Sequence, residues 1–592
     1  MKRLVYSLVL FTSLGCKADN WHDPRMVYGF DNIEPSANLT WTSCFDNFTC
    51  SRLEVPLDYS NRSLGTTSIA FIKLAGKNAT VNSPSIVLVP GGPGASGVDL
   101  LLGQSSTTGQ IFGEQYNVIS FDPRGVNNSG PRLDCFSGST EARLTFNRLH
   151  RTGATNISST SLEEQYYSSS IYGEWCNDAA ENQSPHGYYV TTPAVAHDLL
   201  TFVEAEAELA GQSPSDARLW CYGISYGTVI GTTFASMFPD RVGRMILDGV
   251  LDAEQYYDND WRDNVDQMDE TMEMFSSFCH SAGPETCSFW GPTPADITAR
   301  MDCIIDQLQN HPVALSGVQS RNLPELVTYS DLKALFINAT YAPLASFPDM
   351  ADILHQLEHG NVSSLRGKFV GQDITSDARL VIQCTDSYRR NRLTTIKEFG
   401  SYVEYTTSKS KYIGDIYPIF LETILCRSFR PQLPDSMVVQ GRVRCLLDFP
   451  GRYFYYKKLL VAVVWDSATS LDGLFTCNAR ATEYRKRPTV LKYINRNSLP
   501  FCRSRPHSYF DSGYISPKTT RTTAFGRNQK VTKPTMTTPS TNAAGEPFNL
   551  KKIWTNSRYQ LKVMATRDVE ADTQYMDAFE VAGMPAIAVD KI

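Results

Sequence analysis

The sequence predicts an α/β fold, in which a mostly parallel sheet is flanked by helices, and two observations support this prediction. Short apolar runs alternate with helical patterns from residue 30 to residue 255, as they do in consecutive βα units. Most of these runs are rich in strand-forming residues and end at a turn. We therefore expect strands at 68–74, 85–89, 118–122, 219–222 and 244–248.

The rest of the chain divides into four further regions. Residues 256–425 have the pattern of helices and loops, which predicts a mainly helical region. Residues 426–515 are irregular, with one apolar strand expected at 459–465. Residues 516–547 are rich in Thr, Ser, Pro and Lys, so we expect a disordered linker that buries no core. Residues 548–592 have no pattern that assigns them.

Residues 1–18 have the pattern of a secretion signal. Two basic residues precede an apolar run at 4–14, which is too short to cross a bilayer. Small residues allow cleavage after Gly15 or after Ala18. The alternative is a buried N-terminal strand. No later apolar run approaches the ~20 residues of a membrane helix, so we expect a secreted protein with no membrane partner.

Two residue types agree with export. Fourteen cysteines suit an oxidising compartment, and their spacing is not that of a zinc site. Cys44 with Cys50 and Cys279 with Cys287 are the pairs expected from proximity in the chain. N-glycosylation sequons occur only in the first 361 residues, at Asn38, Asn47, Asn61, Asn78, Asn127, Asn156, Asn182, Asn338 and Asn361.

The charge balance argues against a nucleic-acid-binding protein. The formal net charge of this chain of 592 residues is −7, and 20% of the residues are charged. A nucleic-acid binder normally presents a basic face. We therefore expect no nucleic-acid partner.

The chemistry is concentrated around Ser225. Residues 223–227 read Gly-Ile-Ser-Tyr-Gly, which is the pattern G-x-S-x-G, and they lie between the expected strand at 219–222 and an expected helix at 228–237. A strand, a sharp turn and a helix in this order expose a strained nucleophilic serine. The N-terminus of the helix favours negative charge that develops there. The alternative is a glycine-rich structural turn.

A second glycine-rich loop follows the expected strand at 85–89. It reads Pro-Gly-Gly-Pro-Gly-Ala-Ser-Gly over residues 90–97 and lacks the Lys-Ser/Thr of a phosphate-binding P-loop. In hydrolases with a nucleophile elbow, a loop in this position supplies an amide to the oxyanion hole. We predict the backbone amides of Gly92, or of a residue next to it, and of Tyr226 as the donors.

These segments together resemble the prolyl-aminopeptidase and tripeptidyl-aminopeptidase group of α/β-hydrolases, above all its secreted fungal and actinobacterial members. The resemblance rests on VPGGPGASGV, YNVISFDPRGV, YGISYGTVIG and FPDRVGRMILDGVLD, with CSRLEVPLDYS and IQCTDSY as further landmarks, and it covers about residues 41–426. It implies an α/β-hydrolase fold with a helical cap, and a peptidase that acts on free N-termini. Pro90 is a departure, because the family usually has His before GGPG.

The resemblance also implies an acid and a histidine after the cap. The strand at 459–465 runs into Asp466, which keeps the Asp and Thr spacing of the family but neither proline, and His507 is the only histidine beyond His359. The order Ser, Asp, His suits the fold. The 41 residues between them (507 − 466) exceed the usual spacing. We predict Asp466 as the acid and His507 as the base; the alternative for His507 is a surface histidine.

Other carboxylates remain open at this point. Asp252 follows the strand at 244–248 and is an alternative acid, although we prefer a structural role at a strand end for both Asp248 and Asp252. Recognition of a free amine requires a carboxylate in the cap. Glu270 and Glu273 are candidates, and the competing interpretation places them on the solvated face of a helix.

The resulting hypothesis is a secreted serine exopeptidase that acts through an acyl-enzyme. Ser225 attacks the carbonyl, His507 moves the proton, and Asp466 orients the imidazole. This chemistry needs no metal and no cofactor. Two alternatives stay open, namely an esterase or lipase on the same fold, since fold does not determine substrate, and an inactive homologue with an incomplete triad.

Overall fold

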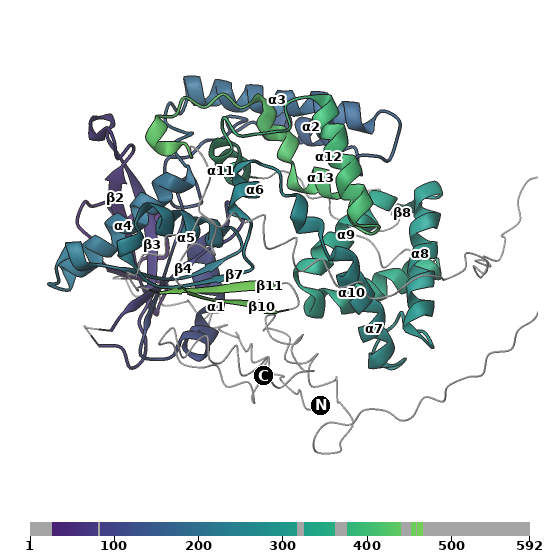
Figure 1. Ribbon diagram of the computed structural model, residues 1–592, viewed down its shortest axis with the longest axis horizontal. Coiled ribbons are helices and arrows are strands. Elements are labelled where there is room, and N and C mark those ends of the chain that lie inside the picture. The colour runs from purple at the N-terminus through teal and green to yellow at the C-terminus, as the bar shows by residue number, and fades with distance from the viewer. Residues whose placement is uncertain are drawn as a thin grey trace, which may run out of the picture.

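A nine-stranded sheet forms the centre of the protein, in the order β1-β2-β3-β5-β4-β6-β7-β11-β10 (Figure 1). The computed structural model describes residues 26–80, 83–315, 325–360 and 376–439, together with the backbone of two strands at 451–456 and 459–465. The strands are β1 (Thr42–Cys44), β2 (Phe48–Pro56), β3 (Thr66–Leu74), β4 (Ser85–Val89), β5 (Asn117–Phe121), β6 (Leu219–Ile224), β7 (Val242–Asp248), β10 (Gly451–Tyr456) and β11 (Leu459–Trp465).

The centre of the sheet is parallel and its edges are antiparallel. β5, β4, β6 and β7 are parallel neighbours. β1, β2 and β3 add antiparallel strands on one side, and β11 and β10 add an antiparallel hairpin on the other. Every expected strand is present, within two residues at each end, so the predicted α/β fold is confirmed. The sequence did not predict β1, β2 and β10.

The two faces of the sheet belong to two separate cores because successive strand residues point to opposite sides. Val87, Val89 and Leu247 point to the face that α4 (Thr192–Leu209) and α5 (Tyr226–Met237) cover, in the core that continues into the helical cap. Ile86, Leu88 and Ile246 point to the other face, where α1 (Gly97–Phe112) contributes Val98, Leu101 and Phe112. This double burial explains the continuous apolar sequence of the central strands.

A helical insertion lies between β5 and α4. It contains α2 (Thr140–His150) and α3 (Ser161–Asn182), and a disulfide joins Cys135 to Cys176. These helices come from the segment 30–255 that the sequence assigned to the core, yet α3 packs on the cap at Thr423–Ser428 and on α12 (Ile396–Lys409; Figure 1). The cap is therefore built from two separate segments of the chain.

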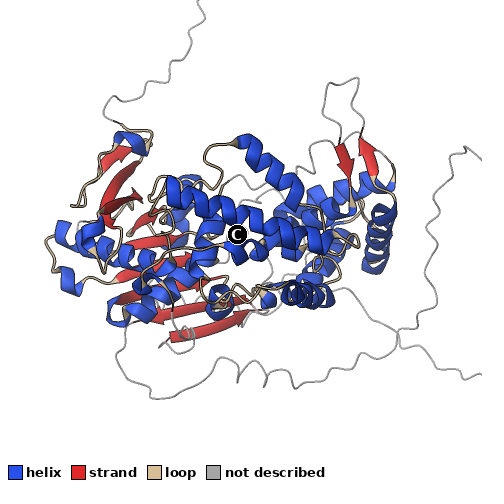
Figure 2. Ribbon diagram, turned by 90° about the horizontal axis from the view of Figure 1, so that it is seen from above, coloured by secondary structure: helices blue, strands red, loops and turns tan. Residues whose placement is uncertain are grey.

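The second segment of the cap runs from α6 to residue 439, and its helices gather beside and above the sheet (Figure 2). A disulfide at the end of α7 joins Cys279 to Cys287, and another joins Cys44 to Cys50, so both disulfides expected from the sequence are confirmed. The elements are α6 (Ala253–Tyr257), α7 (Met268–Ala282), α8 (Pro294–Asn310), β8 (Val313–Leu315), β9 (Glu325–Val327), α9 (Tyr329–Tyr341), α10 (Pro343–Glu358), α11 (Ala378–Asp386), α12 (Ile396–Lys409) and α13 (Tyr417–Leu421).

A buried arginine ties two of the landmark segments together. Arg124 lies in the segment FDPRGV and forms a bidentate ion pair with Asp198 of α4, with both N–O distances at 2.7 Å. It also donates to the carbonyl oxygens of Pro56 and Leu57, in the segment VPLDYS. Since a buried charge requires such compensation, these landmark residues keep β2 and α4 in place.

Several predicted regions lie outside the described residues. They are the signal at 1–18, the linker at 516–547 and the tail at 548–592. Within the part of the chain that the structure describes, no helix is both long enough and apolar enough to span a bilayer.

Candidate active site

Ser225 lies at the turn between β6 and α5. Its backbone has φ 55° and ψ −121°, a conformation that non-glycine residues rarely adopt. The turn is held by hydrogen bonds from the Ser225 amide to the Asp248 carbonyl oxygen, at 2.9 Å, and from the Thr228 amide to the Ser225 carbonyl oxygen, at 2.8 Å. Strain that the surroundings hold in place in this way is typical of a functional site.

The two glycines that flank this turn are required by packing. A Cβ atom on Gly223 would lie 2.6 Å from the Gly227 carbonyl oxygen, and a Cβ atom on Gly227 would lie 2.4 Å from the Val89 carbonyl oxygen. No side chain fits at either position without displacing backbone. The G-x-S-x-G pattern is therefore explained by close contact among β4, β6 and α5.

The second glycine-rich loop lies directly beside Ser225. A Cβ atom on Gly91 would lie 3.1 Å from the Ser225 Cβ atom and 3.5 Å from its Oγ atom. Gly92 has φ +107°, which favours glycine. The loop and the N-terminus of α5 therefore approach the serine hydroxyl together, as an oxyanion hole made of two backbone segments requires.

Asp122 holds the far end of this loop. It follows β5, and one of its carboxylate oxygens accepts from the Ser96 hydroxyl at 2.6 Å and from the Val98 amide at 3.1 Å. The other oxygen accepts from the backbone and side-chain nitrogens of Asn128. Burial raises the pKa of Asp122, and these donors oppose the shift. The landmark FDPRGV thus supports the loop as well as the fold.

A buried polar network lies behind the elbow. Asp386, the last residue of α11, accepts hydrogen bonds from the Thr192 amide at 2.7 Å, from the Thr192 hydroxyl at 2.6 Å and from the Tyr256 hydroxyl at 2.7 Å. The Thr192 Oγ atom also lies 2.6 Å from the Tyr226 hydroxyl. Burial raises the pKa of Asp386 to about 7. This network joins the cap to the first residue of α5.

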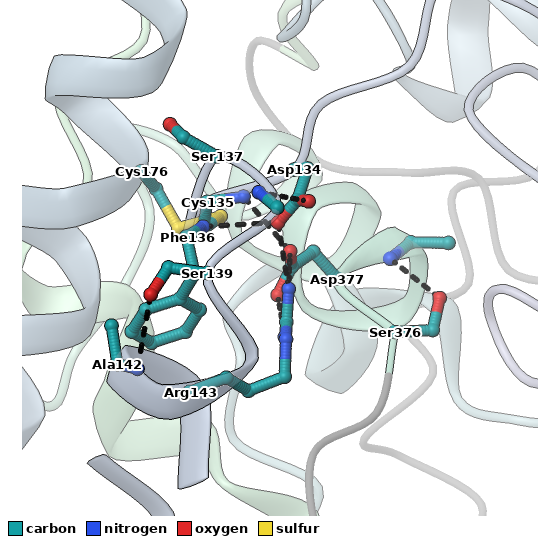
Figure 3. Close-up of polar contacts among 12 residues, drawn as sticks. Asp134, Cys135, Phe136, Ser137, Ser139, Ala142, Arg143, Cys176, Ser376 and Asp377 are labelled. Atoms are coloured by element: carbon teal, nitrogen blue, oxygen red, sulfur yellow. Dashed lines mark hydrogen bonds and ion pairs between the residues drawn. A yellow bond between two sulfur atoms is a disulfide. The ribbon is translucent and has the colours of Figure 1, made fainter. Parts of the chain in front are cut away.

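The other end of α11 is anchored to the α2–α3 insertion. Asp377 accepts from the Cys135 amide at 2.8 Å and from the guanidinium of Arg143 at 2.6 and 2.8 Å (Figure 3). It also accepts from the Tyr172 hydroxyl at 2.6 Å. Asp134 binds the same guanidinium. A disulfide from Cys384 of α11 to Cys426 adds a covalent link within the cap.

The sequence analysis did not single out Asp386 or Thr192. Asp386 belongs to the segment IQCTDSY, which was noted only as a landmark of the family. A charged residue at the end of an otherwise buried helical stretch was the available signal, because such a carboxylate needs several donors.

Asp248 and Asp252 have hydrogen-bond partners that agree with structural roles. Asp248 ends β7 and accepts from the Tyr222 hydroxyl. Asp252 is the N-cap of α6, and one of its oxygens accepts from the amides of the second and third helical residues, Glu254 and Gln255. Burial raises the pKa of both carboxyls. Asp252 nevertheless follows the strand that pairs with β6 at the level of the elbow.

Asp466 and His507 lie outside the described residues, and both stay predictions. The strand that precedes Asp466 is described, and it runs antiparallel to β7. Its last residue, Trp465, pairs with Arg244, whereas Asp248, at the other end of β7, pairs with Ile224 next to Ser225. The four residues from 244 to 248 correspond to about 13 Å along the sheet. The register of β11 therefore does not by itself bring its end to Ser225.

The cap carboxylates differ in their surroundings. Glu270 and Glu273 are exposed on α7, which lies apart from α5 (Figure 1). Glu422 is fully buried and is paired with both Arg151 and Arg379. A carboxylate with two guanidinium partners is already compensated, so it offers little additional attraction to a substrate ammonium group.

One group of side chains in the described part of the chain has the spacing of metal ligands. Ligand atoms of His355, Glu358 and His359, at the end of α10, lie within 4.8 Å of one another. Both oxygens of Glu358 are bound to Arg300, with the Nε–Oε1 distance at 2.6 Å. Since this guanidinium competes with a cation for the carboxylate, we assign no metal to these residues.

The chain is similar to known proteins with the α/β-hydrolase fold. Residues 84–283 match the family described as the alpha/beta hydrolase fold. Serine protease Hip1 of Mycobacterium tuberculosis (strain ATCC 25618 / H37Rv) is 26% identical over 351 residues, which cover 57% of this chain and 63% of that protein. The chain thus matches less than two thirds of the length of that relative.

Two further relatives have names that indicate different substrates. Tripeptidyl aminopeptidase of Streptomyces lividans is 26% identical over 242 residues, covering 39% of this chain and 41% of that protein. Carboxylesterase B of Mycobacterium tuberculosis (strain CDC 1551 / Oshkosh) is 22% identical over 415 residues, covering 64% of this chain and 74% of that protein. Peptide and ester substrates are both represented among proteins similar to this one.

Proposed function

This chain has the α/β-hydrolase fold, and we propose that it is a secreted serine peptidase that releases short peptides or single residues from free N-termini. One observation carries the hydrolase part of the proposal. Ser225 adopts a strained conformation at a strand–helix turn, and the glycine-rich loop lies so near that a Cβ atom on Gly91 would be 3.1 Å from the Ser225 Cβ atom. This arrangement exposes a hydroxyl next to two backbone segments that can donate to an oxyanion.

The proposed reaction proceeds through an acyl-enzyme. The Ser225 hydroxyl attacks the substrate carbonyl, and the amides of Gly92 and Tyr226 stabilise the negative charge on its oxygen. His507 accepts the serine proton and returns it to the leaving amine, while Asp466 orients the imidazole. Water then hydrolyses the ester by the same steps. All of these roles are proposals.

The preference for peptides rests on the relatives named serine protease and tripeptidyl aminopeptidase. An ester substrate is the second candidate, and the match to a protein named carboxylesterase B favours it. Both substrates pass through the same acyl-serine, so the elbow alone does not distinguish them.

Secretion is supported by the surface of the described residues. The asparagines of the sequons at 38, 47, 61, 78, 127, 156, 182 and 338 are all exposed, where an oligosaccharide could be attached without unfolding. Disulfides whose two cysteines both lie in the described residues occur within the core, at Cys44–Cys50, and within the two segments of the cap. Such cross-links persist in oxidising compartments. We expect the secreted chain to lack residues 1–18 and to lose mass on treatment with an N-glycosidase.

The deciding experiment compares substrates on the purified secreted chain. Aminoacyl- and tripeptidyl-anilides are tested beside short-chain acyl esters, and a fluorophosphonate probe measures the reactivity of Ser225. Cleavage of an anilide with a free N-terminus, but not of its N-acetylated form, supports the exopeptidase. Cleavage of esters alone supports the esterase, and a chain that the probe does not label is an inactive homologue.

A further inference from the structure

We infer that Asp386 is a positioning residue for the oxyanion hole, and this inference rests on the proposed function. Asp386 is 2% exposed and lies behind the elbow, so it does not touch a substrate. It acts on Tyr226, whose backbone amide is a proposed oxyanion donor. The link is the short chain of hydroxyl groups between the two residues.

The directions of these hydrogen bonds follow from the number of protons available. Above pH 7, where Asp386 is ionised, its carboxylate can only accept, so the single Thr192 hydroxyl proton is donated to it and the Thr192 oxygen accepts from the Tyr226 hydroxyl. The order is therefore Tyr226 O–H to Thr192 O–H to the carboxylate. An amide side chain in place of the carboxylate would direct N–H groups at one of these donors and break the order.

α11, the helix that ends at Asp386, also packs against the glycine-rich loop, which is proposed to supply the other oxyanion donor. A Cβ atom on Gly94 would lie 2.7 Å from the Arg379 amide nitrogen and 2.9 Å from its Cα atom, so the start of α11 lies against the glycine-rich loop. The end of α11 fixes Tyr226 through Asp386 and Thr192. One helix of the cap thus contacts both segments that are proposed to donate to the oxyanion.

Asp386 is not needed to hold α11 in the cap. Asp377 anchors the start of the helix to the α2–α3 insertion, and the disulfide between Cys384 and Cys426 anchors its end. A change at Asp386 should therefore alter the position of Tyr226 more than the position of the helix. A small displacement of an oxyanion donor is sufficient to slow acylation strongly.

The experiment uses the full secreted chain and three variants of the hydroxyl chain, Asp386→Asn, Thr192→Val and Tyr226→Phe. The control is Asp377→Asn, which removes a buried carboxylate charge at the other end of the same helix. The rate of fluorophosphonate labelling, kcat, KM and the melting temperature are measured for each above pH 7, where the Asp386 carboxyl is ionised. We expect Asp386→Asn and Thr192→Val to lower kcat and the labelling rate by about 10-fold to 100-fold, with KM changed by less than about threefold.

The outcomes separate this inference from the proposed function. If the wild-type chain is labelled and Asp386→Asn and Thr192→Val are labelled at the same rate, the inference is wrong. It is also wrong if Asp377→Asn loses as much activity, because the effect would then come from any weakening of α11. A wild-type chain without labelling overturns the proposed function, and the inference with it. If Asp386→Asn does not fold, the labelling rates and kcat of Thr192→Val and Tyr226→Phe decide whether the inference holds, and rates equal to those of the wild type would overturn it.

Discussion

β6 and β11 are both short apolar strands of the same sheet, and both precede a residue that the sequence nominates for catalysis. β6 is parallel to β4 and β7, and it ends at Ser225. β11 is antiparallel to β7, and its last residue, Trp465, pairs with Arg244, near the start of β7. Two apolar strands thus end at opposite ends of β7, and only the end of β6 lies at the nucleophile elbow.

The comparison shows that composition predicts a strand but not its direction. An apolar run that favours a strand is compatible with a parallel or an antiparallel neighbour. Direction depends on the connection that precedes the strand. β6 follows α4 in a crossover, whereas β11 follows β10 after a two-residue gap and pairs with it as a hairpin. The difference in direction between β6 and β11 can be tested through catalysis and stability.

The largest effect is expected at the end of β6. Ser225→Ala should remove covalent labelling by a fluorophosphonate and lower kcat by about 10⁴-fold or more, because no other group replaces the nucleophile. The control is Ser236→Ala, on the same helix, where the hydroxyl is bound to the Thr232 carbonyl oxygen. Labelling that survives in Ser225→Ala, detected by gel fluorescence, would show that another residue reacts.

Variants of Asp466 and His507 test whether the segment after β11 supplies the acid and the base. His507→Ala and Asp466→Asn should each lower kcat by about 10³-fold to 10⁴-fold if they complete a triad with Ser225. Asp252→Asn is the matched variant, since asparagine also caps a helix well, and we expect its kcat within about threefold of the wild-type value. Loss of activity in Asp252→Asn but not in Asp466→Asn would place the acid after β7 instead.

The packing of the elbow is tested by Gly227→Ala. The new Cβ atom would lie 2.4 Å from the Val89 carbonyl oxygen, so we expect the free energy of unfolding to fall by about 3 kcal/mol. Gly103→Ala is the control, because nothing lies within 4 Å of its Cβ position on α1. That variant should gain about 0.5–1 kcal/mol. Urea unfolding of both variants measures the difference, and equal stabilities would refute the packing argument.

A further effect on stability is its dependence on pH through Asp386. Burial raises its pKa to about 7 in the folded chain, above the value near 4 expected when the chain is unfolded. Between these two values the folded state holds a proton that the unfolded state has released. The free energy of unfolding therefore falls as pH rises, by at most about 1.4 kcal/mol per pH unit, and the contribution becomes constant above pH 7.

Asp386→Asn lacks this titration. The stability of the wild type relative to Asp386→Asn should therefore decline from about pH 4 to pH 7. Urea unfolding at several pH values measures both chains. A difference that stays constant, or that grows with pH, would contradict a raised pKa. The neighbouring hydroxyls of Tyr226, Tyr256 and Tyr257 have pKa values raised by burial, so they do not titrate in this range.

Much of the elbow could be predicted because its determinants are close together in the sequence. The strand, the two glycines, the serine and the following helix lie within residues 219–237, and each has a local signature. The glycine-rich loop could be predicted equally well, because it directly follows a strand with a clear local pattern. The cap was only partly predicted, because the helical patterns of α2 and α3 do not show whether these helices pack on the core or on the cap.

By itself, the sequence determined the α/β class, the strands of the parallel centre, the elbow at Ser225 and two short-range disulfides, since all of these depend on neighbours in the chain. Only the tertiary structure decided that β11 is antiparallel, that residues 140–182 join the cap, and that Asp386 meets Thr192. The physical reason is separation along the chain. Asp386 and Thr192 are 194 residues apart, and no local propensity specifies which distant donors a buried carboxylate will find.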